Sequence, residues 1–224
     1  MIKYSSLLFI YFLSAGSAKA GNTLVAENLL LESQNKVVAT TNVDSLIPSF
    51  RLIVPGKSIG LSSLNEKENK LYKSLGKPGM EDAAMGGKNL ASWYSKPVIR
   101  SGDTVINETN IYFTTPNFGM RNAEPSAKVI RVTSSRFVTK QQVSVGSTLG
   151  QVRKYFPKIK KIASYVSPKT KQEVLIYDDL ASGIAFEIDR QQHCTGITVH
   201  KPGDEPSVIY YGLFGEVKTE ESGH

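Results

Sequence analysis

The chain has few of the residues that cross-link a protein or anchor it in a membrane. Cys194 is the one cysteine among 224 residues, so a disulfide bond within the chain is excluded. Beyond residue 20, no apolar run approaches the roughly 20 residues that a membrane-spanning helix needs. We therefore expect stability to come from a hydrophobic core, and we expect no transmembrane segment after residue 20.

A strong charge bias is also missing. The chain has 27 Lys and Arg against 20 Asp and Glu, which gives a net charge of +7. The first twenty residues hold Lys3 and Lys19 and no acid, so the remainder has 27 − 2 = 25 basic and 20 acidic side chains, or +5. This mild surplus is spread along the chain and gives no reason to expect nucleic-acid binding. Apolar residues at 40% and charged ones at 21% are typical of a globular protein.

The first twenty residues have the pattern of a secretory signal peptide. A basic start at Lys3 precedes an apolar run from Leu7 to Leu13, and small residues follow up to Ala20. This pattern predicts cleavage before Gly21. Cys194 lies far from that site and cannot carry the lipid of a lipoprotein. We expect a water-soluble mature chain in the periplasm or outside the cell.

Two segments of the chain share one pattern. The first opens at 54–60 and the second at 143–150, and each opening leads into a short amphipathic helix. Ser63 with Glu66, and Thr148 with Gln151, have the spacing of capping boxes. The expected apolar stripes are Leu64, Leu71, Tyr72 and Leu75 in the first helix and Leu149, Val152, Tyr155 and Phe156 in the second.

Strands rich in β-branched and aromatic residues follow each predicted helix. We expect them at Asn89–Ser95, Glu108–Thr115, Lys128–Ser134, Ile162–Val166, Glu173–Tyr177, Gly183–Asp189 and Gly196–His200. Within one strand, Ile184, Phe186 and Ile188 alternate with Ala185, Glu187 and Asp189, which predicts one packed face and one solvent-facing face.

The expected fold is therefore α+β, with two tandem modules that each pack a short helix on an antiparallel sheet. The predicted division is a signal peptide (1–20), a lead-in segment (21–49), a first module (50–135), a second module (136–210) and a polar C-terminal tail (211–224).

This organisation resembles two known families. The residues that carry the resemblance are Ser58-Ile59-Gly60 and Leu75-Gly76-Lys77-Pro78 in the first unit, and Val145-Gly146-Ser147-Thr148 with Val152 and Tyr155-Phe156-Pro157 in the second. The pattern is similar to that of the outer-membrane assembly lipoproteins of the SmpA/OmlA type and to the tandem modules of β-lactamase-inhibitor proteins. The resemblance implies binding without catalysis. The chain departs from the lipoproteins because no cysteine follows the predicted signal.

Three sets of residues are candidates for function. Exposed aromatic side chains on a sheet are good anchors for a protein partner, which makes Trp93, Tyr94, Tyr112, Tyr165 and Tyr177 candidates for binding. An alternative set of Asp178, Glu187, Asp189 and His200 suits acid–base or metal chemistry, although these positions also fit a solvated turn and strand face. His193-Cys194 suggests a thiol nucleophile, but strand neighbours point apart, which favours a buried cysteine.

These observations predict an exported, non-enzymatic binding or assembly module of the bacterial envelope. We expect it to contact a protein partner through its sheet faces and to need no cofactor or metal. The alternative is an envelope hydrolase or metal-dependent enzyme that uses the Asp178 to His200 region.

Overall fold

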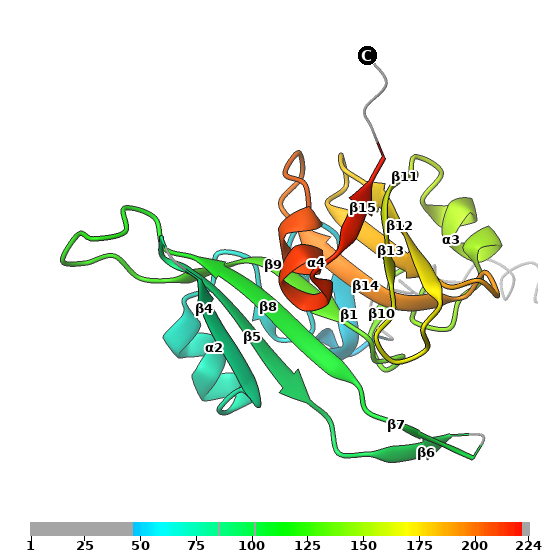
Figure 1. The fold of residues 1–224 in the computed structure, drawn as a ribbon, viewed down its shortest axis with the longest axis horizontal. Coiled ribbons are helices and arrows are strands. Elements are labelled where there is room, and N and C mark those ends of the chain that lie inside the picture. The colour runs from blue at the N-terminus through cyan, green and yellow to red at the C-terminus, as the bar shows by residue number, and fades with distance from the viewer. Residues whose placement is uncertain (1–46, 85, 101, 221–224) are drawn as a thin grey trace, which may run out of the picture. The chain divides into compact units, whose positions relative to one another are not determined.

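A nine-stranded antiparallel sheet dominates the computed structural model, which describes residues 47–84, 86–100 and 102–220 (Figure 1). The predicted signal peptide and most of the predicted lead-in segment lie outside these residues. The strand order across the sheet is β15-β11-β12-β13-β14-β9-β8-β5-β4. In chain order the strands are β4 (Met80–Ala84), β5 (Lys88–Tyr94), β8 (Glu108–Thr114), β9 (Ser126–Val132), β11 (Lys160–Val166), β12 (Glu173–Asp179), β13 (Ile184–Ile188), β14 (Cys194–His200) and β15 (Val217–Thr219).

Smaller elements accompany this sheet. A four-stranded sheet has the order β10-β1-β2-β3, and β6 pairs with β7 in a separate hairpin. The bounds are β1 (Leu52–Val54), β2 (Ser58–Ile59), β3 (Ser62–Ser63), β6 (Val98–Arg100), β7 (Asp103–Val105) and β10 (Val138–Thr139), with a 3-10 turn, η2, at Ser49–Arg51. The helices are α2 (Glu68–Leu75), α3 (Leu149–Tyr155) and α4 (Ser207–Phe214). The α+β class predicted from the sequence is therefore confirmed.

A hydrophobic cluster lies on each face of the large sheet. On the first face, Leu71 of α2 and Val152 of α3 pack with Ile111 and Phe186 in one hydrophobic cluster that also includes Ile53 of the small sheet. On the second face, α4 packs against the strands, as Figure 1 shows. That second cluster contains Ile209 and Tyr210 of α4 with Leu90, Val129, Ile176 and Ala185.

The prediction of a solvent-facing side for the strand around residue 187 is wrong. Ala185 and Glu187 are both 0% exposed, as are Ile184, Phe186 and Ile188 on the opposite side. Alternation in the sequence distinguishes the two sides of a strand, but it does not reveal that a later helix covers the polar side. The helix responsible is α4, which contributes Ile209 and Tyr210 to this face.

The two predicted capping boxes have different outcomes. At α3, the Thr148 side chain accepts a hydrogen bond from Gln151 N, and the Gln151 side chain accepts one from Thr148 N, so that prediction is confirmed. At α2, Ser63 lies in β3 and the helix begins only after Lys67, so Ser63 is not the N-cap. Asn65 adopts a left-handed conformation with φ 62°, which turns the chain before the helix.

Other differences concern single residues and the C-terminal region. Leu149, Val152 and Phe156 are buried, but Tyr155 is 43% exposed and does not belong to the apolar stripe. The tail predicted from residue 211 instead completes α4 and then forms β15, which pairs with β11. None of the helices in the described part of the chain is long and apolar enough to cross a bilayer.

Candidate functional site

A buried ion pair lies on the face of the sheet that α4 covers. Arg131 of β9 is 4% exposed and Glu187 of β13 is 0% exposed. The guanidinium donates from Nε to Glu187 Oε1, and from Nη2 to Glu187 Oε2 at 2.7 Å. Two parallel hydrogen bonds of this kind are the strongest geometry for an arginine and a carboxylate. Because β14 separates β9 from β13, the two side chains meet above an intervening strand.

Gly196 on β14 provides the space for this contact. It pairs directly with Glu187 in the strand register. A Cβ atom at Gly196 would lie 2.5 Å from the carboxylate carbon of Glu187, which is closer than real Cβ contacts. The glycine is therefore required for space above the strand, since any side chain there would displace the carboxylate from Arg131.

Further polar groups extend the ion pair across the sheet. Tyr165 OH donates to Glu187 Oε2 at 2.8 Å, and Arg131 Nη1 donates to Asn110 Oδ1 at 2.7 Å. Arg131 Nη1 also contacts Glu108 Oε2 at 3.3 Å. Asn110 Nδ2 in turn donates to Ser92 Oγ at 2.9 Å. We call Ser92, Glu108, Asn110, Arg131, Tyr165 and Glu187 the polar network; its members come from β5, β8, β9, β11 and β13.

The network keeps Arg131 and Tyr165 protonated. Burial by itself would lower the pKa of Arg131, but the carboxylate of Glu187 outweighs burial and the pKa is raised, so the guanidinium stays charged. Burial raises the pKa of Tyr165, and the negative charge of Glu187 raises it further. The phenol therefore keeps its proton and continues to donate to Glu187.

A cavity of about 640 Å³ lies beside the network. Arg131, Glu187 and Tyr165 line it, together with Leu213 and Phe214 at the end of α4. The Phe214 ring stacks on Tyr165 with centroids 3.7 Å apart and planes 4° apart, and the Arg131 guanidinium is 5.3 Å from the Phe214 ring centre. Apolar walls with a few charged groups at this volume are typical of ligand sites.

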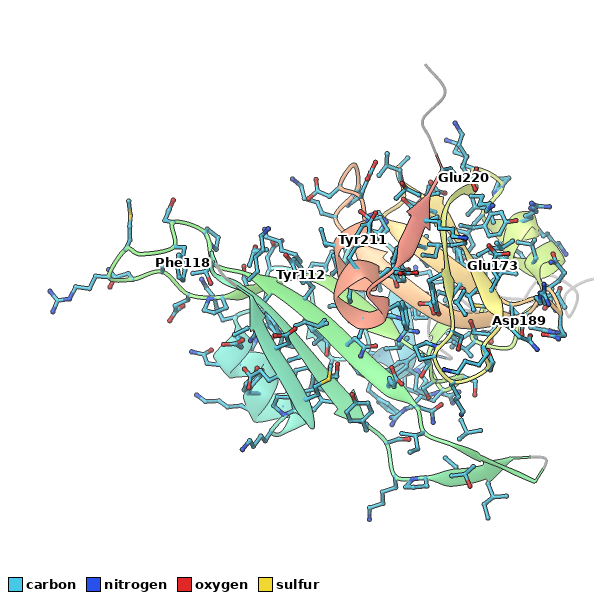
Figure 2. All side chains as sticks on the ribbon, viewed as in Figure 1. Tyr112, Phe118, Glu173, Asp189, Tyr211 and Glu220 are labelled. Atoms are coloured by element: carbon cyan, nitrogen blue, oxygen red, sulfur yellow. The ribbon has the colours of Figure 1, made fainter. Side chains whose placement is uncertain are left out.

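The five predicted aromatic residues lie on two faces of the sheet. Trp93 packs against the first cluster, with its Nε1 donating to Gly76 O at 2.9 Å, and Tyr177 packs against the same cluster. Tyr112 packs against the α4 cluster, beside α4 (Figure 2). Tyr94 and Tyr165 line the cavity, where Tyr94 is 48% exposed and Tyr165 is 5% exposed. The structure therefore brings two of the five to the cavity.

The predicted acidic and histidine set lies in two places, His200 with Asp178 as one pair and Glu187 with Asp189 in the lining of the cavity. His200 and Asp178 pair with each other, with His200 Nε2 2.9 Å from Asp178 Oδ1, and both are buried. Glu187 belongs to the polar network, whereas Asp189 follows β13 and accepts from the backbone N of His193 at 2.8 Å (Figure 2). In the described residues, no group of three or more His, Cys, Asp or Glu side chains has a metal-binding arrangement.

The solvated position expected for Asp178 is also wrong. Asp178 and Asp179 are each 4% exposed, although Asp179 lies at the end of β12 next to a turn. Asp179 remains satisfied there because its carboxylate accepts from Ser182 N at 3.1 Å and from Ser182 Oγ at 2.9 Å. These carboxylates therefore support local structure.

His193 and Cys194 point apart, as strand neighbours do. Cys194 is 1% exposed and belongs to the first hydrophobic cluster, whereas His193 is exposed. Burial raises the pKa of the Cys194 thiol, with a further contribution from the charge of Glu187. Both residues line the cavity described above, but a protonated, buried thiol is a poor nucleophile.

Sequence reasoning missed Arg131, Asn110 and Glu108. A signal for the first of them was present, since Arg131 interrupts the apolar run Val129, Ile130 and Val132, and Glu187 interrupts a similar run in another predicted strand. Opposite charges inside two apolar strands indicate a buried pair.

Comparisons with protein-family models, curated proteins and solved structures found no match for this chain.

Replacement of Gly196 tests the spatial requirement. We expect Gly196→Ala to lower the free energy of unfolding by about 3 kcal/mol, because a displaced carboxylate leaves Arg131 buried and without its charge partner. Gly150→Ala in α3 is the matched control: its added Cβ meets its nearest neighbour at 3.8 Å, so it should be neutral or stabilising. Urea denaturation measures both, and equal effects would contradict the requirement.

The buried phenols predict a loss of stability at alkaline pH. Burial raises the pKa of Tyr165 and of Tyr210 above the ordinary value near 10. Below a pH of about 10, both the folded and the unfolded chain keep these protons. Above that pH, the unfolded chain releases them first. The unfolding free energy therefore falls as pH rises, by up to about 1.4 kcal/mol per pH unit for each phenol. Urea denaturation between about pH 8 and 11 should show a shallower fall for Tyr165→Phe than for the exposed control Tyr155→Phe. Equal pH dependence of the unfolding free energy in the two variants would show that the buried Tyr165 phenol does not cause this loss of stability.

Proposed function

We propose that this protein is an exported, non-enzymatic binding module of the bacterial envelope, and that it takes a segment of a protein partner into the cavity beside α4. The cavity is the observation that carries the proposal. Its volume is about 640 Å³, and its walls include Leu213, Phe214, Val105 and Ile106. Hydrophobic clusters cover much of both faces of the sheet, and this cavity is a place where a partner can reach it.

The hydrogen bonds at the cavity favour binding over catalysis. Arg131 donates to Glu187, Asn110 and Glu108, and Glu187 accepts from Arg131 and Tyr165. A general base needs a lone pair that can reach the proton of a substrate. Here both oxygens of Glu187 are occupied by neighbouring side chains, so its arrangement suits a structural role.

We further propose that residues 50–135 and 136–210 hold two copies of one unit. The strand order supports this, since α2 is followed by β4, β5, β8 and β9, and α3 by β11, β12, β13 and β14. Each set of four strands is contiguous in the sheet, and the two sets join through their last strands, β9 and β14.

Matched backbone contacts at the two helix starts also support a repeat. The N-cap residue of each helix forms an isolated bridge to the start of the fourth strand, Lys67 to Ser126 and Thr148 to His193. The residue two positions before each N-cap has a positive φ, 62° at Asn65 and 97° at Gly146. Corresponding hydrogen bonds are Asn65 N to Ala127 O (2.7 Å) with Gly146 N to Cys194 O (2.8 Å), and Ala127 N to Glu66 O (2.9 Å) with Cys194 N to Ser147 O (2.8 Å).

A doubled unit agrees with the resemblance to the tandem modules of β-lactamase-inhibitor proteins, which is a resemblance to binding proteins. Export is proposed on the signal pattern of residues 1–20. Together these features favour a protein partner outside the cytoplasm.

The rival proposal, a hydrolase or metal-dependent enzyme, has one observation in its favour. His200 and Asp178 form a close pair of the kind that enzymes use for proton transfer. However, His200 is 0% exposed and its second ring nitrogen faces Lys201 O at 3.0 Å. No substrate reaches this pair without a rearrangement, so we favour binding.

Site-specific photo-cross-linking in cells that export the protein tests the proposal. We expect a photoreactive amino acid at Thr170, which lines the cavity, to give discrete protein adducts, and the same group at the exposed Tyr155 of α3 to give none of them. Val105→Trp, which narrows the cavity from β7, should abolish the Thr170 adducts. Identical adducts from both positions, or adducts that persist in Val105→Trp, would contradict a partner in the cavity.

A further inference from the structure

The charges around the cavity do not balance. Its lining includes the carboxylates of Glu108, Glu187 and Asp189 and the cations of Arg131 and Lys169. Arg131 and Glu187 neutralise each other through their paired hydrogen bonds. Lys169 is exposed on the turn between β11 and β12 and is solvated there. The cavity therefore carries an acidic excess, although the whole chain has a net charge of +7.

The donors of Arg131 and Tyr165 are already used, whereas an acceptor of the polar network is not. The guanidinium of Arg131 donates from Nε, Nη1 and Nη2 to neighbouring side chains, and the Tyr165 hydroxyl donates to Glu187. Among the residues that the structure describes, the Glu108 side chain receives one contact, at 3.3 Å from Arg131 to Oε2. Within the described part of the chain, its other oxygen, Oε1, accepts no hydrogen bond. Within the polar network, a cationic ligand therefore finds a carboxylate oxygen, whereas the donors for an anion lie outside the network, on lining residues such as Lys169 and Gln191.

Glu108 has the right exposure for this contact. Its side chain is 37% exposed, whereas the side chain of Arg131 is 4% exposed and that of Glu187 is 1% exposed. A ligand can therefore reach Glu108 while the ion pair behind it stays buried. Partial burial also makes a charge contact there stronger than one on an open surface.

Apolar residues line the same cavity as this carboxylate. Leu213 and Phe214 come from the end of α4, and Val105 and Ile106 lead into β8, where Glu108 lies. Ile106 is 45% exposed, which leaves apolar surface for a partner to cover. Aliphatic side chains suit these walls, and the methylene stem of a lysine or arginine packs on apolar surface while its charged end reaches an acid.

We propose that the cavity selects a partner segment in which one lysine or arginine is flanked by aliphatic residues, and that Glu108 receives the cation. This inference rests on the proposed function, because it specifies the segment that the cavity binds. Aliphatic neighbours supply contact area, and the cation supplies selectivity through the unused carboxylate oxygen.

Three peptides with the same fluorophore distinguish binding in the cavity from selectivity for a cation. They are acetyl-Leu-Lys-Leu, acetyl-Leu-norleucine-Leu and acetyl-Leu-Glu-Leu. Norleucine keeps the aliphatic stem of lysine without its charge. Fluorescence anisotropy with the full mature chain should give Kd values that rise in this order, with about a tenfold difference between the lysine and glutamate peptides. Raising the salt from about 0.05 to about 0.5 M should reduce that difference.

Charge-neutralising variants locate the preference. Glu108→Gln should reduce the advantage of the lysine peptide over the norleucine peptide to less than about twofold. The control, Glu173→Gln, removes an exposed carboxylate from β12 outside the cavity lining and should keep the advantage (Figure 2).

Each other outcome has a defined meaning. Equal Kd values for the lysine and glutamate peptides on the unmodified protein would overturn the charge selectivity and leave the cavity as a binding site. Failure of all three peptides to bind would overturn both the selectivity and the proposed function. Loss of the lysine preference in Glu173→Gln as well as in Glu108→Gln would show a general charge effect and overturn the role of Glu108.

Discussion

The ion pair between Arg131 and Glu187 is the interaction on which the rest of this structure depends. It joins β9 and β13 above β14, so it connects the two groups of four strands on either side of the centre of the sheet. Removing two charges from water is unfavourable unless the geometry is good and the remaining hydrogen-bonding groups are satisfied. Tyr165 and Asn110 meet that requirement, and Gly196 leaves the room for it.

The pair also determines where the protein can bind. Hydrophobic clusters lie on the two faces of the sheet, with α2 and α3 on one side and α4 on the other. Phe214, at the end of α4, lies on Tyr165 and near the guanidinium of Arg131. The helix therefore ends above the polar network, and the cavity opens beside it. Arg131 and Glu187 pair with each other and line the cavity. Glu108, the most exposed of the three charged residues, remains available to a ligand.

Much of the sheet could be predicted from the sequence because its signals are local. Each of the seven predicted strands overlaps an observed one, and the cap at Thr148 depends on residues three positions apart. The helix α4 was missed because its sequence, SVIYYGLF, is apolar around nearly its whole circumference and shows no amphipathic period. Without α4, the polar side of β13 reads as a solvent-facing side.

The candidate site was less predictable because its contacts are distant in the sequence. Arg131 and Glu187 are 56 positions apart, and their contact depends on strand order and register, which alternation alone does not define. Tyr165 was selected as an exposed anchor, yet its hydroxyl is buried against Glu187. The aromatic pattern identified Tyr165 as a candidate, but its role depends on Glu187, which lies in another strand.

A double-mutant cycle tests most directly whether the ion pair holds the sheet together. The unfolding free energies of the unmodified protein, Arg131→Met, Glu187→Met and the double variant would be measured by urea denaturation. Each single variant should lose about 3–5 kcal/mol, because it leaves one buried charge without a partner, and the double variant should lose clearly less than the sum. Single losses below about 1 kcal/mol that add in the double variant would contradict the account, since they would show that the pair contributes little to the fold.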